Sequence, residues 1–305
     1  MKNKTLLFIF LGLLGVFLIS QFAFERKTRT FKTELIKLDT AAITAIKIYP
    51  KSENQEEIVL NKEGSFWVAN KNNVTTKANV DAVNSMLRNL ALIKTKRVVA
   101  KSPEKWVDYE VEETNSTRIK AFQGDKLLED FIVGRFNFNQ QTRQGVSYVR
   151  LAKGDEIYAV DGFLSMTMGQ GFDAYRNKGI LTVSSNDLTQ IAINTLGNTT
   201  ILQKLGNNWT QDGNPVDSTS ISSYLNGLQN INGSTFVNDF DELQAPNLLY
   251  KTVSFEGNNL STPIIIKAFR DTTRTEPYII QSSLNEDGYF ASGDAGIFTQ
   301  LFGTW

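Results

Sequence analysis

A nine-residue pattern occurs twice in this chain. Residues 60–68 read "LNKEGSFWV" and residues 202–210 read "LQKLGNNWT", with Leu, Lys, Gly and Trp at matching positions. A repeat at this distance indicates duplication of a whole folding unit, because each copy is long enough to bury a core of its own. The chain is therefore expected to contain two versions of one fold.

The similarity extends on both sides of this pattern. The second copy follows the first at a distance of about 140 residues, and the distance shortens along the chain, as loops of unequal length would produce. The matching segments are "ITAIKIY" (43–49) with "LTQIAIN" (188–194), "NVDAVNSMLRNLALI" (79–93) with "DSTSISSYLNGLQNI" (217–231), and "KAFQG" (120–124) with "VSFEG" (253–257).

Each copy predicts strands joined by tight turns, with one helix. The turns contain Gly64 and Gly206, which supply the positive φ that tight hairpins need. Apolar residues recur at helical spacing in 79–93 and 217–231, with Asn79 as the candidate N-cap of the first helix and Asp217 or Ser218 as that of the second. We expect an α+β fold made of two tandem units, each an antiparallel sheet with a helix packed on one face.

Trp67 and Trp209 occupy equivalent positions in the two copies. Each ends a hairpin strand shortly before the capped helix. A buried aromatic ring of this size dominates local packing energy, so both are predicted to be structural core residues between sheet and helix.

The N-terminus predicts a membrane segment. Lys2 and Lys4 precede an apolar run, and Thr5 to Phe24 is long enough to cross a bilayer as a helix of roughly 30 Å. Bulky Phe22 and Phe24 make a poor signal-peptidase site, so an uncleaved anchor is favoured over a cleaved signal peptide. The positive-inside rule places the bulk of the chain on the extracytoplasmic, periplasmic side of the cytoplasmic (inner) membrane as a single-pass protein. The expected organisation is an anchor at 1–24, a stalk at 25–42, unit one at 43–175 and unit two at 176–305.

Composition excludes several kinds of chemistry. The chain has no Cys and no His, so thiol nucleophiles, Cys/His zinc sites and a Ser-His-Asp triad cannot be built. Lys+Arg and Asp+Glu both number 32, which gives no basic footprint for nucleic acid. The acidic stretch "NDFDEL" (238–243) lacks the spacing of a calcium loop. We expect no enzyme activity, no cofactor, no metal site, no catalytic residue and no nucleic-acid partner.

Several segments resemble a known family. The hairpin "NKEGSFW", the helix ending "LRNLALIKTKRVV", "EKWVDYEV" (104–111), "YVRLAKGDEIYAVDGFL" (148–164) and "AYRNKGIL" (174–181) are similar to the bacterial envelope family called domain of unknown function 4340 (DUF4340), typical of Bacteroidetes-like bacteria. The resemblance implies a membrane-tethered extracytoplasmic module, with some members accompanying ABC-transporter or gliding-motility auxiliary proteins. The family has no agreed active site, so the resemblance assigns no catalytic residue.

Three functions remain open from the sequence. The first is a membrane-anchored binding or scaffolding module with an envelope or transporter protein as partner. The second is a small-ligand or glycan-binding protein whose cleft lies between the copies near 162–179, where Arg176 and Lys178 would meet an anionic group. The third, a glycan hydrolase using two carboxylates, has no sequence pair in its support.

Overall fold

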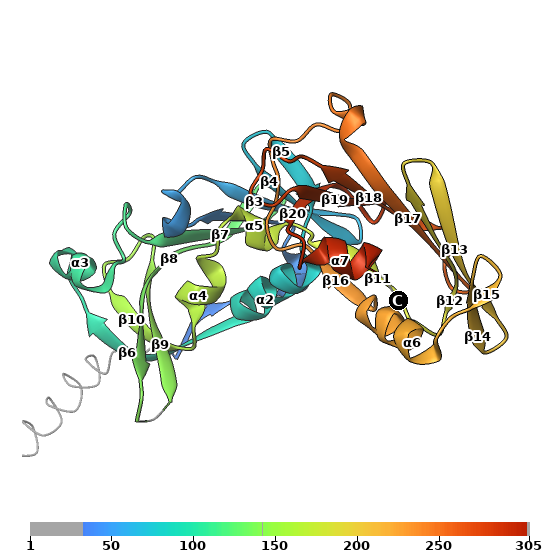
Figure 1. The fold of residues 1–305 in the computed structure, drawn as a ribbon. Coiled ribbons are helices and arrows are strands. Elements are labelled where there is room, and N and C mark those ends of the chain that lie inside the picture. The colour runs from blue at the N-terminus through green and yellow to red at the C-terminus, as the bar shows by residue number, and fades with distance from the viewer. Residues whose placement is uncertain (1–32, 142, 304–305) are drawn as a thin grey trace, which may run out of the picture.

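The computed structural model describes residues 33–141 and 143–303 (Figure 1). Strands make up most of the regular structure, so the predicted α+β class is wrong and the fold is mostly β. The predicted helix on each sheet is present, but it spans only 12 residues in the first half of the chain and 10 in the second. The sheets beside these helices have ten and eight strands. Stretches of alternating apolar and polar residues, such as "VSYVRL", form additional strands. Each sheet therefore contains many more residues than the helix that packs on it.

The first sheet is antiparallel and has the order β1-β6-β10-β9-β8-β7-β2-β3-β4-β5. Its strands are β1 (Glu34–Lys37), β2 (Ala45–Tyr49), β3 (Ile58–Glu63), β4 (Phe66–Lys71), β5 (Val74–Lys77), β6 (Leu92–Ala100), β7 (Thr117–Gln123), β8 (Lys126–Asn139), β9 (Gln144–Leu151) and β10 (Ile157–Asp161).

The second sheet is also antiparallel and has the order β15-β14-β13-β12-β17-β18-β19-β20, while β11 and β16 pair separately. These strands are β11 (Gly179–Thr182), β12 (Leu188–Thr195), β13 (Asn198–Leu205), β14 (Asn208–Gln211), β15 (Asn214–Pro215), β16 (Asn230–Asn232), β17 (Leu249–Gly257), β18 (Ile264–Arg270), β19 (Tyr278–Ser282) and β20 (Asn285–Ser292).

The two sheets share one strand order. The run β10-β9-β8-β7-β2-β3-β4-β5 in the first corresponds, strand for strand, to β20-β19-β18-β17-β12-β13-β14-β15 in the second. The pair β1–β6 likewise corresponds to the pair β11–β16. We call residues 33–175 the first half and 176–303 the second half; the unit boundaries predicted from the sequence stay a prediction.

The helices are short. Some pack on a face of a sheet, and others lie between the two sheets (Figure 1). The Asn79 side chain accepts hydrogen bonds from the N–H groups of Asp81 and Ala82 at the start of α2, and Asp217 accepts one from Ser220 at the start of α6. The helices are α2 (Val80–Ala91), α3 (Trp106–Tyr109), α4 (Leu164–Met168), α5 (Phe172–Tyr175), α6 (Ser218–Gly227) and α7 (Ile297–Phe302), with 3-10 turns η1 (Thr40–Ala42), η2 (Lys51–Glu53), η3 (Pro103–Lys105) and η4 (Pro246–Leu248).

Part of the predicted stalk belongs to the first sheet. Glu34–Lys37 forms β1, which pairs with β6, and Leu35 and Ile36 are buried. Residues 34–37 of the predicted stalk therefore lie in the first sheet, because two adjacent apolar side chains are more stable in the core than in solvent. The boundaries predicted for the stalk, 25–42, stay a prediction.

Each half has a main core and a smaller one on the opposite face of its sheet. The main cores lie between sheet and helices, with Met86 and Leu90 of α2 in the first half and Ile221 and Leu225 of α6 in the second. The smaller clusters surround Ile132 and Tyr148 in the first half, and Phe269 and Ile279 in the second.

The predicted membrane segment at 1–24 lies outside the described residues. Among residues 33–141 and 143–303, none of the helices has the length and apolar composition needed to cross a membrane.

Candidate functional site

A pocket of about 390 Å³ lies in the first half, where four separate segments meet. Most of its lining residues are small or polar, although the surface they present to the pocket is largely apolar. The lining residues are Lys51 and Ser52 of η2, Glu110 after α3, Asn115, Ser116 and Thr117 before and at β7, Val133, Gly134 and Arg135 of β8, and Ser165 and Gly169 at α4.

Two glycines allow these segments to approach closely. A Cβ at Gly134 would lie 2.2 Å from the carbonyl oxygen of Tyr109, so the end of α3 can rest directly on β8. A Cβ at Gly169 would lie 2.6 Å from the carbonyl oxygen of Ser165 and 3.0 Å from Oγ1 of Thr117. Any larger side chain at either position would push a wall of the pocket away.

The pocket contains two cations in different states. Lys51 Nζ lies 2.7 Å from Glu110 Oε2, so its charge is already matched. The Arg135 guanidinium lies over the rings of Tyr109 and Tyr148, with its carbon 5.4 Å and 5.6 Å from their centroids. Within the described residues no carboxylate lies within 4.0 Å of Arg135, and the side chain is exposed. Arg135 is therefore a positioned cation that can accept an anionic group from outside.

Hydroxyl groups also face this region. The Ser52 hydroxyl donates to the carbonyl of Gly169 at 3.1 Å, and the Lys51 N–H donates to Oγ1 of Thr117 at 3.3 Å. Oγ of Ser165 is buried and has no hydrogen-bond partner in the part of the chain that the structure describes. A buried hydroxyl without a partner is costly unless a ligand or water completes it, which marks this wall as a polar contact point.

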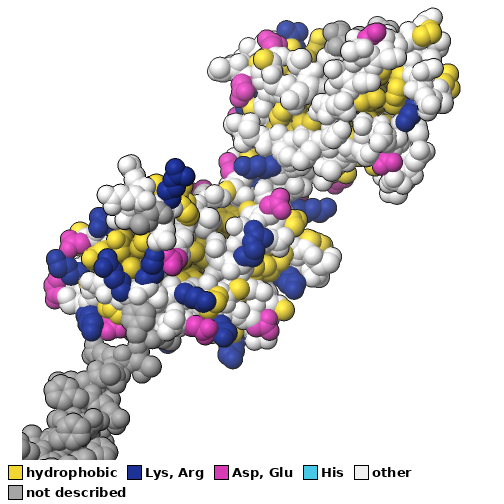
Figure 2. Space-filling view, turned by 90° about the horizontal axis from the view of Figure 1, so that it is seen from below, with side chains coloured by type: hydrophobic (Ala, Val, Ile, Leu, Met, Phe, Trp, Pro, Cys, Tyr) yellow, Lys and Arg dark blue, Asp and Glu magenta, His cyan; other side chains and the backbone are white. Residues whose placement is uncertain are grey.

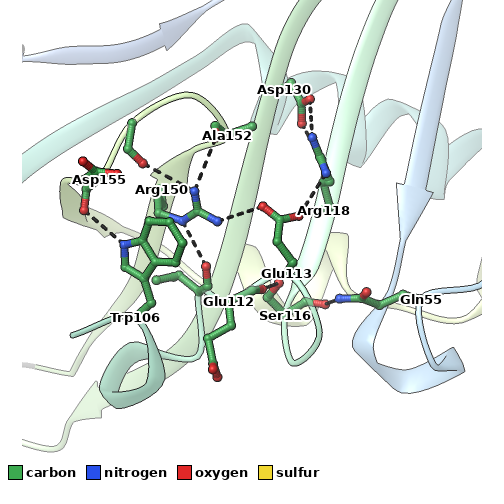
Figure 3. Close-up of polar contacts among 12 residues, drawn as sticks. Gln55, Trp106, Glu112, Glu113, Ser116, Arg118, Asp130, Arg150, Ala152 and Asp155 are labelled. Carbon is green, nitrogen blue, oxygen red and sulfur yellow. Dashed lines mark hydrogen bonds and ion pairs between the residues drawn. The ribbon is translucent and has the colours of Figure 1, made fainter. Parts of the chain in front are cut away.

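The outer wall is held by a buried arginine (Figure 3). Arg150 of β9 is 1% exposed, and its Nε donates to the carbonyl of Val111 at 3.0 Å. The guanidinium carbon lies 3.7 Å from the centroid of the Trp106 ring, whose Nε1 donates to the carbonyl of Asp155 at 3.2 Å. These contacts fix α3 and the segment after it, which carries Glu110 into the pocket.

Glu113 links this arginine to a second one. Its carboxylate lies 3.1 Å from Arg150 Nη2 and 3.0 Å from Arg118 Nη1 (Figure 3). Arg118 also forms a two-point contact with Asp130, with both nitrogen–oxygen distances 2.8 Å. The hydrogen bonds to Asp130 raise the pKa of Arg118 above its ordinary value. The chain of alternating charges holds the loop before β7 rigidly against the sheet.

The structure places Arg176 and Lys178 at the junction of the two halves. Arg176 is 4% exposed; its Nη1 donates to Asp173 at 3.1 Å and to Asn238 at 2.7 Å. Its guanidinium carbon lies 3.6 Å from the centroid of the Phe236 ring. Asp173 precedes the junction and Asn238 follows it, so this arrangement favours a structural role for Arg176.

Backbone bonds reinforce the same junction. The carbonyl of Lys178 accepts from the N–H of Gly233 at 2.8 Å, and the N–H of Asn177 donates to the carbonyl of Lys77 at 2.8 Å. Neither Arg176 nor Lys178 lines the 390 Å³ pocket. Their predicted role at an anionic ligand stays a prediction.

The two tryptophans contact the main cores. Trp67 is half-buried and packs against the core of the first half, and Trp209 is 7% exposed in the core of the second half. Trp209 also borders a polar surface pocket of about 280 Å³ beside Lys204 and Asn226.

The carboxylates of the acidic stretch 238–243 contact neighbouring groups of the protein. Asp239 pairs with Arg274, Glu242 pairs with Lys267 at 2.6 Å, and Asp241 accepts hydrogen bonds from Leu243 and Gln244. In the residues described, three or more carboxylates do not gather in any place where they could hold a metal ion.

The sequence did not predict the pocket, although two of the segments that resemble the family contain the lining residue Glu110 and the residues that support its wall. Trp106 and Glu110 lie in "EKWVDYEV", and Arg150 lies in "YVRLAKGDEIYAV". One signal was available in the sequence: Arg150 is a charged residue within an otherwise apolar strand. If that face of the strand is covered, the buried arginine needs a polar or charged partner.

One family of known proteins matches the chain. The domain of unknown function DUF4340 matches residues 67–249, which is more than half of the chain and includes both Trp106 and Arg150. No curated protein and no solved structure matches the chain. The extent of the family match shows that the chain belongs to the DUF4340 family.

Proposed function

We propose that this protein is a non-enzymatic binding module, held at the outer side of the cytoplasmic membrane by its apolar N-terminal segment, which captures an acidic segment of an envelope protein. The observation that carries the proposal is Arg135. This cation is stacked over two tyrosine rings at a preformed pocket and has no carboxylate partner among the described residues.

The pocket favours binding over catalysis. Its lining includes one carboxylate, Glu110, and Lys51 already neutralises that group. Hydrolysis of a glycan needs two carboxyl groups about 5–10 Å apart, one to donate a proton and one to attack or activate water. The pocket offers instead a guanidinium and hydroxyl groups, which suit a carboxylate and the backbone of an extended peptide.

The rigid wall supports a preorganised site. Trp106, Arg150 and Glu113 hold the loop that carries Glu110 and Ser116, so little conformational entropy is lost when a partner binds. An accessory subunit of a transporter or of another envelope complex requires this kind of fixed recognition surface. Capture of a soluble small ligand or glycan is the second candidate, and the pocket volume of about 390 Å³ would suit a single sugar or amino acid.

The test is site-specific photo-crosslinking of the full-length protein in cells. A benzophenone amino acid at Asn115, which lines the pocket, is expected to give one protein adduct, and Arg135→Gln is expected to reduce it at least fivefold. Arg97→Gln, which removes an exposed arginine elsewhere on the first half, should leave the adduct unchanged.

The same probe at Asn226, beside the pocket of the second half, gives the background. Equal adduct yields at both positions would contradict the proposed pocket. So would an adduct at Asn115 whose yield is unchanged by Arg135→Gln. Absence of any protein adduct at Asn115, with a sugar or peptide found by mass spectrometry instead, would favour the second candidate.

A further inference from the structure

An exposed aromatic and basic surface lies at one end of the first sheet. We call it the aromatic end and define it by Phe136 and Phe138 of β8, Phe163 before α4, Leu92 of β6, and the cations Arg88 and Lys94. Phe138 is 45% exposed and Phe163 is 44% exposed. Adjacent exposed aromatic rings are uncommon on a surface that meets only water, and they indicate a contact surface.

The three rings form a built cluster. The centroid of Phe136 lies 4.9 Å from that of Phe163 and 6.4 Å from that of Phe138, and the centroids of Phe138 and Phe163 are 6.3 Å apart. Gly145 on β9 makes the cluster possible, because a Cβ there would lie 2.7 Å from the Phe136 ring and 3.0 Å from the Phe163 ring. The rings therefore lie against the strand and present their other surfaces outward.

A groove of about 430 Å³ adjoins the cluster and combines apolar and cationic groups. Leu92 and Phe163 line it together with Arg88 and Lys94. The single acidic residue of its lining, Asp161, lies 2.6 Å from Lys96 and is already paired. Over the residues that the structure describes, neither Arg88 nor Lys94 has a carboxylate within 4.0 Å. The groove thus carries unmatched positive charge next to apolar surface.

The described chain begins at this same place. The carbonyl of Thr33 accepts a hydrogen bond from the N–H of Thr95 at 2.9 Å. In the register of β1 and β6, Glu34 lies opposite Lys94, which lines the groove. The segment 25–32 separates residue 33 from the apolar run that ends at Phe24. Eight fully extended residues span at most about 29 Å. The aromatic end therefore lies within roughly this distance of the end of the apolar run.

Figure 2 shows this side of the molecule. On the first half, Lys and Arg side chains, Asp and Glu side chains and hydrophobic patches lie next to one another. The preceding segment "ERKTRTFK" (25–32) carries four basic residues and one acidic residue.

We propose that the aromatic end rests on the phospholipid bilayer, with Phe138 and Phe163 in the interfacial region and Arg88 and Lys94 on lipid phosphates. Aromatic rings are favoured at this depth of a bilayer, and basic side chains are attracted to anionic lipid. The inference rests on the membrane tether of the proposed function. It adds a second contact, which fixes the orientation of the first half and leaves the second half directed away.

The absence of cysteine allows a direct test on the full-length chain. Gln140→Cys, beside the β8–β9 turn, and Asn207→Cys, in the β13–β14 turn of the second half, are each labelled with the environment-sensitive dye NBD. Both proteins are reconstituted into vesicles of phosphatidylcholine and phosphatidylglycerol, with or without a lipid that carries a nitroxide quencher near its headgroup.

We expect the quencher to reduce the fluorescence at position 140 at least twofold more than at position 207. Phe138→Ser with Phe163→Ser should abolish the difference, and Arg88→Gln with Lys94→Gln should reduce it in vesicles containing phosphatidylglycerol. Leu196→Ser with Leu205→Ser is the matched control, because both leucines are exposed on the second sheet, at 75% and 57%. It should change nothing.

The outcomes separate the two proposals. If the chain floats with the vesicles but position 140 is quenched no more than position 207, the bilayer contact is overturned and the tether stands. If the chain does not float, the tether fails and the bilayer contact fails with it. A concentration-dependent emission shift at position 140 in detergent solution would overturn the bilayer contact by showing that a second copy covers the aromatic end.

Discussion

The two halves of the molecule use one strand order but cover the outer faces of their sheets differently. In the first half, the segment between β6 and β7 covers this face through Trp106, which stacks on Arg150. In the second half, the segment between β16 and β17 covers it through Phe240, whose centroid lies 4.9 Å from that of Phe269 and 5.2 Å from that of Tyr289. The first cover packs on a charged side chain of the sheet, whereas the second packs on aromatic and apolar side chains and adds the Glu242–Lys267 ion pair.

The difference is visible at one pair of facing residues on the outer face of each sheet. Arg150 lies opposite Ile132 in the first sheet, and Ile279 lies opposite Phe269 in the second. An apolar pair stabilises any cover that buries it, whereas the guanidinium requires acceptors at fixed positions. The comparison teaches that the sheet accepts either solution, and in the first half the charged one fixes the segment that carries Glu110 into the pocket.

The largest expected effect is at Arg150. Arg150→Met removes the donor to three carbonyl groups and leaves Glu113 without that partner, so we expect a loss of about 3 kcal/mol in the free energy of unfolding. Ile279→Met, on the outer face of the corresponding strand β19, should cost less than about 1.5 kcal/mol because volume is nearly conserved. Urea unfolding followed by tryptophan fluorescence measures both. Equal losses would show that the two covers are held in the same way.

A smaller loss is expected from a single methyl group at Gly134. Gly134→Ala places a Cβ against the carbonyl oxygens of Tyr109 and Glu110, and overpacking of this kind costs about 2 kcal/mol. The substitution should also displace α3 and weaken crosslinking from Asn115. Gly227→Ala is the control in the second half, because a Cβ there meets nothing within 4 Å. That variant should be neutral or slightly stabilising, and a destabilised Gly227→Ala would argue against the packing explanation.

The junction between the halves gives the third prediction. Arg176→Met removes the buried guanidinium together with its hydrogen bonds to Asp173 and Asn238. We expect a loss of about 1.5 kcal/mol in the free energy of unfolding. We also expect faster proteolytic cleavage near residues 176–178. Lys178→Met is the control, since its backbone bond to Gly233 remains. If Lys178→Met proved as harmful as Arg176→Met, the side-chain bonds of Arg176 would not be what holds the junction.

Local features of the fold were predictable from the sequence. Gly64 and Gly206 have positive φ, as the hairpin turns required, and Asn79 and Asp217 cap their helices as predicted. Each of these features depends on a few adjacent residues. The extent of the sheets was not predictable, because β1 and β6 join the first sheet through pairings with strands far away in sequence.

The pocket was missed for a related reason. Arg150 lies in an alternating strand, where a charged residue usually indicates a face open to solvent. The segment between β6 and β7 covers that face, and no local pattern in the sequence reveals the cover. Arg176 and Lys178 were predicted to meet an anionic ligand because they are basic residues near the junction. The Arg176 side chain instead donates a hydrogen bond to Asn238, which lies 62 residues further along the chain.

The smallest predicted effect concerns acid stability and the ion pairs of Arg274 in the second half. In the second half, Arg274 contacts both oxygens of Asp239, and its hydrogen bonds hold the pKa of Asp239 below the ordinary value. Hydrogen bonds from Thr273, followed by those from Arg274, do the same for the pKa of Asp271. A lowered pKa in the folded state means that the unfolded chain binds protons more tightly. The stabilisation is therefore complete above about pH 4, the ordinary range for Asp, and is lost as the pH falls through the folded values.

Arg274→Met should return the pKa of Asp239 towards its ordinary value while the Thr273 bonds to Asp271 remain. We expect the thermal midpoint of this variant to fall less steeply between pH 5 and pH 3 than that of the unchanged protein. Arg97→Met removes the same charge from the first half, where Arg97 has no ion pair among the described residues, and should leave the slope unchanged. If both variants flattened the slope equally, net charge would be the cause, and the Arg274 cluster would not distinguish the halves.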